Sequence, residues 1–487
     1  MKQLDVLFVH TPPVPPSRPV GMGHPRLELM LSKLQIQHRF RFFNREEKEQ
    51  PFQVTDVGLL SLSSHLQQAG YSTGYFLPDM RQHESSRLES YCDELEAFLR
   101  NNQVGYLAFG PYTCVYPTAQ AIARRAKNVS PNTRIIIGGQ HATFVDTQIL
   151  AEAPFVDFVV RREGEKPLES ILRLSGKHDM MDARGITCRK RNVITRNPDS
   201  EPLPGSEIPA QDYERLPSWL QGSDILMNIP TGRGCPWRCF FCTEAAFWGK
   251  PRQRTARKVA EEISALSSKL RVNKIRFSDD TFAFNRSFLG ELVTEFRDHG
   301  IDLQAAQVWT RVDAVNQEVL KRISALAENV EICYGVESGS EGVLKAMRKG
   351  ITVEQIIRAL RISRTLGIYS TCFWIVGHPG SSPQEEKVST DLMCRLIDEN
   401  LCSSHQVSVF QPYPGSEAFE SPQKSGVIMD SYEWNRYSEA PPVFPAVSHL
   451  ENFSPTEIML AYLERRARHY EHICKQMDVD PKSALQL

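Results

Sequence analysis

The 487-residue sequence lacks a surplus of charge of either sign. It contains 57 Lys and Arg residues and 58 Asp and Glu residues, which give a formal net charge of -1. A chain with this balance has no overall basic field that would hold nucleic acid or an anionic membrane. We therefore do not expect nucleic acid among its partners.

Long apolar runs and a disulfide pattern are also missing. The apolar run at residues 4–9 is too short for the hydrophobic region of a signal peptide. The most apolar later stretch, residues 369–376, is too short to span a bilayer. The 11 cysteines are an odd number in a long chain, which argues against a secreted disulfide framework. We expect a cytoplasmic protein without a membrane span.

The first third of the sequence alternates short apolar runs with segments of helical composition. Strands are expected at residues 4–9, 72–77, 106–109, 134–137 and 157–160, and helices at 59–70, 92–101, 118–128 and 146–153. This alternation predicts a doubly wound, Rossmann-like α/β domain over residues 1–175. Ligands of such domains bind outside the carboxyl ends of the strands. Residues 176–222 are interpreted as a linker that contains a small hairpin at 184–197.

A second alternation follows, with six repeats of a strand and a polar or glycine-rich cluster. The strands are expected at residues 225–229, 274–277, 303–309, 330–334, 369–376 and 406–410, with five helices between them at 256–270, 286–299, 317–328, 353–366 and 383–399. Six such units predict a partial (β/α)6 TIM-like barrel over residues 223–425. Barrel active sites gather at the C-terminal ends of the strands.

The pattern weakens in the last segment, residues 426–487, which we expect to be mostly helical. Ser454 and Glu457 form a capping-box pattern with Pro455 at the first helical position, and they predict a helix over 458–476. The basic run from Arg465 to Arg468 is interpreted as a solvated face of that helix.

Three cysteines, Cys235, Cys239 and Cys242, stand in a C-x3-C-x2-C pattern. This spacing could also mark one buried face of a helix, but Gly234 and Pro236 make a helix interior improbable there. A loop that wraps an iron–sulfur cluster fits better, because thiolates are the usual ligands of such clusters. Zinc is a further alternative, although it would need a fourth ligand that does not lie nearby.

The cysteine spacing, with an aromatic residue before the last cysteine, resembles the radical S-adenosylmethionine (SAM) enzymes. The resemblance continues through Trp248-Gly249, Phe277-Ser278-Asp279-Asp280, Arg311, Gly335-Val336-Glu337-Ser338-Gly339-Ser340, Gly377-His378-Pro379-Gly380 and Pro412-Tyr413-Pro414-Gly415. The N-terminal part is similar to the cobalamin-binding domain of one branch of that family. That similarity rests on Gly138-Gly139-Gln140-His141-Ala142-Thr143, Val156-Asp157 and Glu163-Gly164-Glu165.

The resemblance implies roles in the barrel. The three cysteines would ligate a 4Fe-4S cluster, and its open iron would bind SAM. The backbone at Phe241 would meet the adenine. Contacts with SAM are implied for Glu337, Ser338, Arg311 and Gly377. Asp279 and Asp280 are the candidate catalytic residues and would face SAM or the substrate. A helix-capping role for Asp280 is an equal alternative.

Contacts with cobalamin are implied at Tyr112, Thr113, Gly138, Gly139, His141 and Glu163. The segment from Pro78 to His83 departs from the D-x-H-x2-G pattern that supplies a lower axial histidine in many cobalamin folds. A surface role is therefore favoured for His83.

The reaction that the resemblance implies is methyl transfer from methylcobalamin to carbon, or less often phosphorus, of a small-molecule or natural-product substrate. It would proceed through a 5′-deoxyadenosyl radical, with electrons from a donor such as flavodoxin or ferredoxin. Oxidative cyclisation or rearrangement with the same cofactors is the alternative, and a non-enzymatic cobalamin or redox sensor is an alternative of another class. The other eight cysteines are expected in the core, with Cys114 the one to look for near the corrin.

Overall fold

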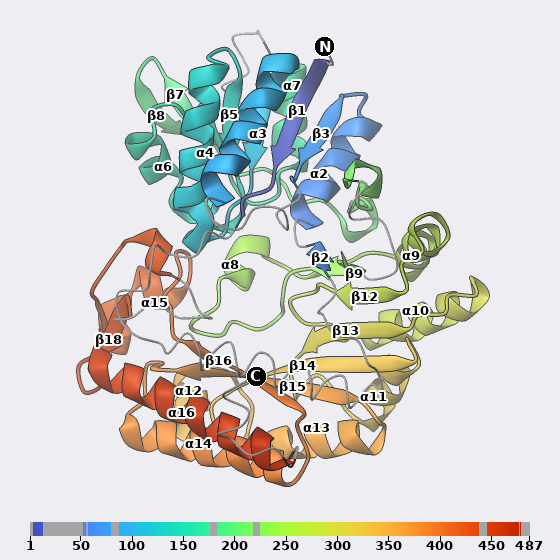
Figure 1. The fold of residues 1–487 in the computed structure, drawn as a ribbon, viewed down its shortest axis with the longest axis vertical. Coiled ribbons are helices and arrows are strands. Elements are labelled where there is room, and N and C mark those ends of the chain that lie inside the picture. Colours follow the sequence, from blue (N-terminus) through green and yellow to red (C-terminus); the bar gives the residue numbers. More distant parts are fainter. Residues whose placement is uncertain are drawn as a thin grey trace. The chain divides into compact units, whose positions relative to one another are not determined.

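The computed structural model describes residues 3–12, 52–54, 57–78, 87–175, 183–217, 225–437, 446–476 and 478. The chain divides into two compact units that interleave in sequence. The first covers Met1–Pro16, Val54–Gly222 and Ala246–Arg254, and the second covers Ser17–Gln53, Ser223–Ala245 and Thr255–Leu487. Each unit contains a seven-stranded sheet (Figure 1). Within the described ranges, no helix is long and apolar enough to cross a membrane.

The first unit is a doubly wound α/β fold, as the sequence predicted. Its five parallel strands are β1 (Gln3–Val9), β3 (Thr73–Phe76), β4 (Gln103–Phe109), β5 (Arg134–Ile137) and β6 (Phe158–Val160). The predicted hairpin is present as β7 (Ile186–Lys190) and β8 (Val193–Arg196), and it extends the same sheet by two antiparallel strands. The helices are α2 (Val57–Gln68), α3 (Arg87–Asn101), α4 (Tyr116–Val129), α5 (Gly139–Phe144), α6 (Asp146–Glu152) and α7 (Glu165–Arg173).

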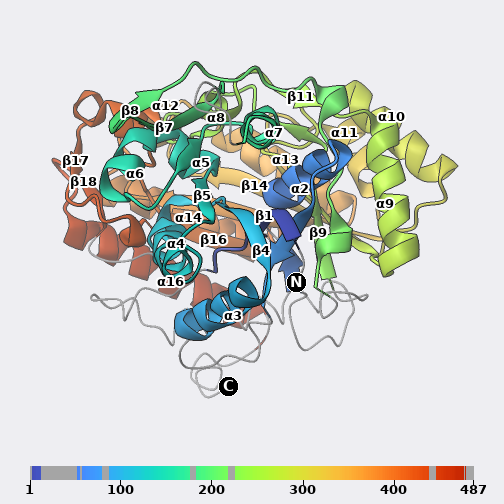
Figure 2. The same ribbon diagram turned by 90° about the horizontal axis from the view of Figure 1, so that it is seen from above.

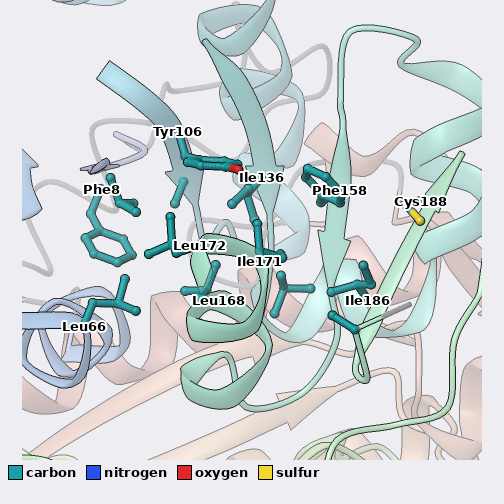
Figure 3. Packing of buried hydrophobic residues seen from close by; sticks show 14 of the residues in the cluster. Phe8, Leu66, Tyr106, Ile136, Phe158, Leu168, Ile171, Leu172, Ile186 and Cys188 are labelled. Carbon is teal, nitrogen blue, oxygen red and sulfur yellow. The ribbon is translucent and has the colours of Figure 1, made fainter. Parts of the chain in front are cut away.

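One hydrophobic cluster joins the sheet of the first unit to α2 and α7. Figure 3 shows Phe8, Ile136 and Phe158 from the strands beside Leu66 of α2 and Ile171 of α7. The buried stretches of these strands, such as residues 6–9 and 135–137, are apolar because both faces of the sheet are covered there. The burial fixes the strand ends, and therefore the loops that follow them.

The strand order of the first unit is β3-β1-β4-β5-β6, so the direction of winding reverses between β1 and β4. Ligands of open α/β sheets bind at this switch point, outside the carboxyl ends of the strands. The loop after β1 begins with His10 and Thr11, and the loop after β4 begins with Gly110. The topology therefore marks these two loops as the ligand-binding edge of the first unit.

The second unit is a partial barrel of six parallel strands in chain order. They are β9 (Ile225–Ile229), β12 (Lys274–Phe277), β13 (Ala305–Thr310), β14 (Asn329–Glu337), β15 (Tyr369–Val376) and β16 (Ser404–Val409). A seventh strand, β2 (Phe52–Val54), lies beside β9 at one edge. The predicted (β/α)6 order is confirmed. β14 runs three residues beyond its predicted end at Tyr334, with a register shift between Gly335 and Glu337.

Helices connect these strands and pack on the sheet. They are α9 (Ala256–Leu270), α10 (Arg286–Asp298), α11 (Gln317–Ser324), α12 (Glu341–Ala346), α13 (Val353–Thr365) and α14 (Pro383–Asp398). Figure 2 shows α9 and α10 side by side. Side-chain oxygens cap the first turns of all six of these helices, from Thr255, Asn285, Asn316, Ser340, Thr352 and Ser382. The helices therefore begin at positions that the sequence dictates locally.

The final segment adds α15 (Glu417–Glu420), the antiparallel pair β17 (Val427–Met429) and β18 (Ser448–Leu450), and the long helix α16 (Pro455–Gln476). The predicted capping box is present: Glu457 N donates to Ser454 Oγ at 3.3 Å, and Ser454 N donates to Glu457 Oε2 at 2.8 Å. The prediction that the basic run from Arg465 to Arg468 faces solvent is wrong for two of its arginines. Arg465 is 0% and Arg466 is 6% exposed, because α16 packs against α14 and a carboxylate there accepts the buried charge of Arg465.

Candidate functional site

The three cysteines of the C-x3-C-x2-C pattern lie on a loop, not on a helix. Residues 234–243, which hold them, contain no helix, and α8 (Glu244–Trp248) begins only after the last cysteine. Gly234 has a φ of +88°, a conformation that suits glycine, and Cys242 N donates to Cys239 O at 3.1 Å in the turn that follows. All three thiols are free and partly exposed. The loop therefore presents three thiols from one turn, and the buried-stripe alternative is wrong.

Burial and, to a lesser extent, nearby carboxylates disfavour the ionisation of two of these thiols. Burial raises the pKa of Cys235, which lies 3.4 Å from Thr281 Oγ1. Burial and the Glu244 carboxylate raise the pKa of Cys242 well above its usual value. Thiols bind a metal ion only after losing their protons, and a bound cation would favour the thiolate form of these cysteines.

Arg311, the residue directly after β13, brings a positive charge to the cysteine loop. Its Nη1 lies 3.5 Å from Cys239 Sγ, and its guanidinium lies 4.6 Å from the Trp237 ring centroid. Asp313 holds the guanidinium in place through two hydrogen bonds of 2.9 Å. The planar fork of arginine suits this bidentate pairing. Arg311 is therefore fixed against the loop before any ligand binds.

Glu337 and Lys349 form a buried ion pair, of which only Glu337 was predicted as a site residue. Glu337 Oε1 and Lys349 Nζ are 2.6 Å apart, with side chains 9% and 7% exposed. Glu337 has a φ of +67° at the register shift of β14, and Lys349 Nζ lies 5.9 Å from the centroid of the Phe241 ring. Lys349 was missed because it stands on a turn twelve residues later in the sequence. The pair places one carboxylate and one ammonium beside the cysteine loop.

Asp279 and Asp280 hold the backbone of the cysteine loop. Asp279 accepts hydrogen bonds from Thr231 Oγ1 at 2.9 Å and Thr231 N at 3.2 Å, and Asp280 accepts one from Gly234 N at 3.1 Å. Burial, the Glu244 carboxyl and Asp279 raise the pKa of Asp280 well above its usual range. The following helix α10 is capped by Asn285, not by Asp280. Both aspartates therefore connect β12 to the loop that carries the thiols.

Ser338 and Gly377 lie at the ends of β14 and β15. Ser338 Oγ is 2.9 Å from Ser389 Oγ and accepts a hydrogen bond from Ser340 N, so its hydroxyl is used within the fold. Gly377 has a φ of +80°, and its N–H donates to Glu386 Oε1 at 2.9 Å. A ligand at either position would therefore contact the backbone, since the Ser338 hydroxyl is already hydrogen-bonded and Gly377 has no side chain.

In the first unit, the predicted residues gather at the ends of β4, β5 and β6. Tyr112 is 62% exposed, whereas His141 is 1% exposed and its Nδ1 lies 3.3 Å from Thr113 Oγ1. The His141 ring also packs on Tyr116 at 4.5 Å between centroids, and burial lowers the pKa of His141 to about 3. His141 is therefore neutral and holds the Thr113 loop, while the Tyr112 side chain is mostly exposed.

Two glycines bring the loops of the first unit close together. A Cβ on Gly138 would lie 3.3 Å from Val160 O, and Gly139 has a φ of +88° beside the Gly110 backbone. Glu163 is paired with Arg252 at 2.5 Å, so its carboxylate anchors the segment Ala246–Arg254. His83 lies outside the described residues.

Seven of the remaining eight cysteines are buried, as expected, and Cys114 is not. Cys114 is partly exposed, and the other seven are buried: Cys92, Cys188, Cys333, Cys372, Cys394, Cys402 and Cys474. Ligand atoms of Cys372, Cys402 and His405 lie within 4.8 Å of one another in the barrel wall. Cys402 Sγ donates to Ser404 O at 2.9 Å, as a packed thiol does.

Two known families match parts of the chain. The Radical SAM superfamily matches residues 229–392, and the B12 binding domain matches residues 49–172. An uncharacterized methyltransferase of Pyrococcus horikoshii is 29% identical over 349 residues, which are 70% of this chain and 73% of that protein. An anaerobic magnesium-protoporphyrin IX monomethyl ester cyclase of Rubrivivax gelatinosus is 27% identical over 400 residues, which are 78% of this chain and 68% of that protein.

Two solved structures share the fold over nearly the whole chain. The radical SAM methyltransferase TsrM of Kitasatospora setae has a TM-score of 0.66 at 15% identity, with 96% of this chain and 89% of that chain covered. The cobalamin-dependent SAM radical enzyme OxsB has a TM-score of 0.62 at 16% identity, with 98% and 62% covered. At these identities the likeness shows the fold alone.

Proposed function

The chain belongs to the cobalamin-binding radical SAM enzymes, and from that premise we propose that it is a methyltransferase. The reaction would move a methyl group from cobalamin to an unactivated carbon, or less often phosphorus, of a small-molecule substrate, through a 5′-deoxyadenosyl radical. The observation that carries the proposal is the presence, in one chain, of a three-thiol loop at barrel strand ends and of a B12 binding domain. A methyltransferase among the most similar relatives supports it.

The thiol loop fits a 4Fe-4S cluster. Three free cysteines on one turn match the usual ligands of such clusters, and the described residues of the loop provide no fourth cysteine, which leaves one iron for SAM. The bound cluster would supply the electron that cleaves SAM. Arg311 would hold its guanidinium against Cys239 and offset the negative charge of the thiolates. Burial raises the pKa of the Asp280 carboxyl well above its usual range, which disfavours a further negative charge beside the loop.

Other barrel residues would hold SAM. We assign the adenine to the backbone at Phe241, and the ribose or amino acid part to Glu337, which Lys349 fixes in place. Ser338 and Gly377 would contribute backbone carbonyl groups, since the Ser338 hydroxyl and the amides of both residues are already used within the fold. Asp279 and Asp280 are proposed to position the thiol loop. Preorganised charges of this kind bind a ligand without reorganising.

The first unit fits cobalamin at its switch point. Thr11, in the loop after β1, has a buried hydroxyl oxygen without a hydrogen-bond partner among the described residues. Tyr112 is exposed after β4, on the other side of the switch. We assign cobalamin contacts to these loops and to the backbone of Gly138 and Gly139, while His141 and Glu163 would act through the loops that they hold.

The decisive assay uses the full chain, reconstituted anaerobically with iron, sulfide and cobalamin. With reductant and methyl-labelled SAM, a methyltransferase forms S-adenosylhomocysteine and moves label onto the protein-bound cobalamin. A flavodoxin or ferredoxin of the cytoplasm is the proposed physiological electron donor. Absence of 5′-deoxyadenosine under all conditions would overturn the radical reaction. The Cys239→Ala variant should lose the cluster absorbance, and Cys394→Ala, which changes a buried cysteine of α14, should keep it.

Oxidative cyclisation is the second candidate, because cyclase relatives cover as much of the chain as the methyltransferase does. A cyclase would form 5′-deoxyadenosine without S-adenosylhomocysteine and would leave the methyl label on SAM and methionine. The same assay therefore separates the two reactions.

A further inference from the structure

A buried ion pair connects the last helix of the chain to the barrel. Arg465 of α16 is 0% exposed, and its Nη2 lies 2.5 Å from Glu386 Oε2 of α14, whose side chain is 5% exposed. Arg465 also donates to Glu386 O at 2.9 Å and to Thr390 Oγ1 at 3.1 Å. Figure 1 shows α14 and α16 side by side. The arginine is therefore held by three oxygen atoms of one helix.

The other oxygen of the same carboxylate holds the loop after β15. Glu386 Oε1 accepts hydrogen bonds from Gly377 N at 2.9 Å and from Ser381 Oγ. Arg465 on one side and the Gly377 loop on the other thus fix a single carboxylate. The position of Arg465 is therefore linked through Glu386 to that of the Gly377 backbone.

A second contact joins α16 to the same glycine. A Cβ built on Gly377 would lie 3.1–3.2 Å from Ile458, so the first turns of α16 lie directly against the loop. Arg465 also lies 5.9 Å from the centroid of the Trp374 ring on β15. The helix α16 therefore lies against the end of β15 through an apolar contact at Gly377 and a cation–π contact at Trp374.

We propose that Arg465 is a positioning residue for SAM, acting through Glu386 on the backbone of Gly377. The proposal rests on the function proposed above, in which Gly377 contributes to the SAM site. Buried ion pairs add little net stability, since removing two charges from water costs as much as their attraction returns. Such a pair gives a fixed geometry, and here that geometry ends at a predicted cofactor loop. Arg465 lies beyond the matched radical SAM residues 229–392.

The test compares two arginines of the same helix. Arg465→Lys keeps the charge but cannot make three directed hydrogen bonds. Arg468→Lys is the matched control, because Arg468 pairs with Asp391 of α14 at 2.5 Å and the two side chains are 33% and 53% exposed. Both variants are made in the full chain and reconstituted with the cluster. SAM binding is measured by equilibrium dialysis without reductant, together with iron content and 5′-deoxyadenosine formation over a range of SAM concentrations.

We expect Arg465→Lys to weaken SAM binding about tenfold, since small displacements of positioning groups cost factors of this order. Iron content and the rate at saturating SAM should match the wild type, and Arg468→Lys should bind SAM as the wild type does. SAM binding by Arg465→Lys within twofold of the wild type would overturn the proposal. Failure of the wild type itself to bind SAM would instead overturn the proposed function.

A second variant covers the case in which Arg465→Lys does not fold. Arg465→Met combined with Glu386→Gln removes both charges and leaves no buried ion unpaired. We expect this double variant to fold and load iron but to bind SAM more weakly by a similar factor. Wild-type SAM affinity in the double variant would show that the pair only supports packing.

Discussion

The buried ion pair of Glu337 and Lys349 allows the loss of folding stability in a variant to be predicted in magnitude. Lys349→Met removes the ammonium and leaves a carboxylate that is 9% exposed and had its partner at 2.6 Å. Two unit charges at that distance attract by about 6 kcal/mol at an effective dielectric constant of about 20. The water that the pair gave up on burial offsets part of this energy, and breaking one side of a buried pair costs about 3–5 kcal/mol. We expect a loss of stability in that range.

The assay is anaerobic scanning calorimetry of the cluster-free chain. In a domain of this size, 1 kcal/mol lowers the melting temperature by about 2–4 °C, so Lys349→Met should melt roughly 6–20 °C below the wild type. Lys345→Met, an exposed position on α12, is the control and should change little. Adding Glu337→Gln removes the unpaired charge and should recover at least half of the loss. A melting temperature of Lys349→Met within 2 °C of the wild type, or no recovery in the double variant, would refute the reasoning.

Three further predictions concern single positions. Gly335→Ala should destabilise the barrel by about 1–3 kcal/mol in the same calorimetry, because its Cβ would lie 2.5 Å from Glu337 Oε1. Arg311→Lys should lower the iron bound after reconstitution, measured per chain, because lysine cannot pair with Asp313 and stack on Trp237 at once. His141 has a folded pKa of about 3 against 6.5 unfolded, so its contribution to stability is complete above pH 6.5 and is lost as the pH falls toward 3. Relative to His141→Phe, the wild type should lose about 1.4 kcal/mol between pH 7.5 and 5.5 in denaturant unfolding, and parallel profiles would contradict this.

Much of the fold followed from local pattern. The strand at residues 369–376 was predicted with its observed bounds, because eight successive residues that pack on both faces leave little choice of element. The end of β14 was harder. Its last residues include Glu337, and a charged residue usually predicts that a buried strand has ended. Here the carboxylate is buried in the sheet because it pairs with Lys349, twelve residues later.

The cysteine loop could be predicted because glycine and proline exclude a helix at the first cysteine, and the structure agrees. Arg465 could not. A basic run on an amphipathic helix normally faces solvent, and its partner Glu386 lies 79 residues earlier in the sequence. Pairings across such separations depend on how helices pack, which local composition does not encode. The same holds for Asp280 and Gly234, 46 residues apart, whose hydrogen bond holds the loop.

The short strand β2 has a consequence for synthesis. It belongs to the sheet of the second unit, yet it is translated before most of the first unit and about 170 residues before β9, its neighbour in that sheet. At roughly 5–20 residues per second, the ribosome delivers β9 about 10–30 s after β2. During that time β2 has no neighbouring strand to pair with. A gene cut just before β9 would place β2 on the N-terminal half and the other six strands of its sheet on the C-terminal half. When the two halves are co-expressed, the C-terminal half should either take up β2 from the N-terminal half or form its sheet without it.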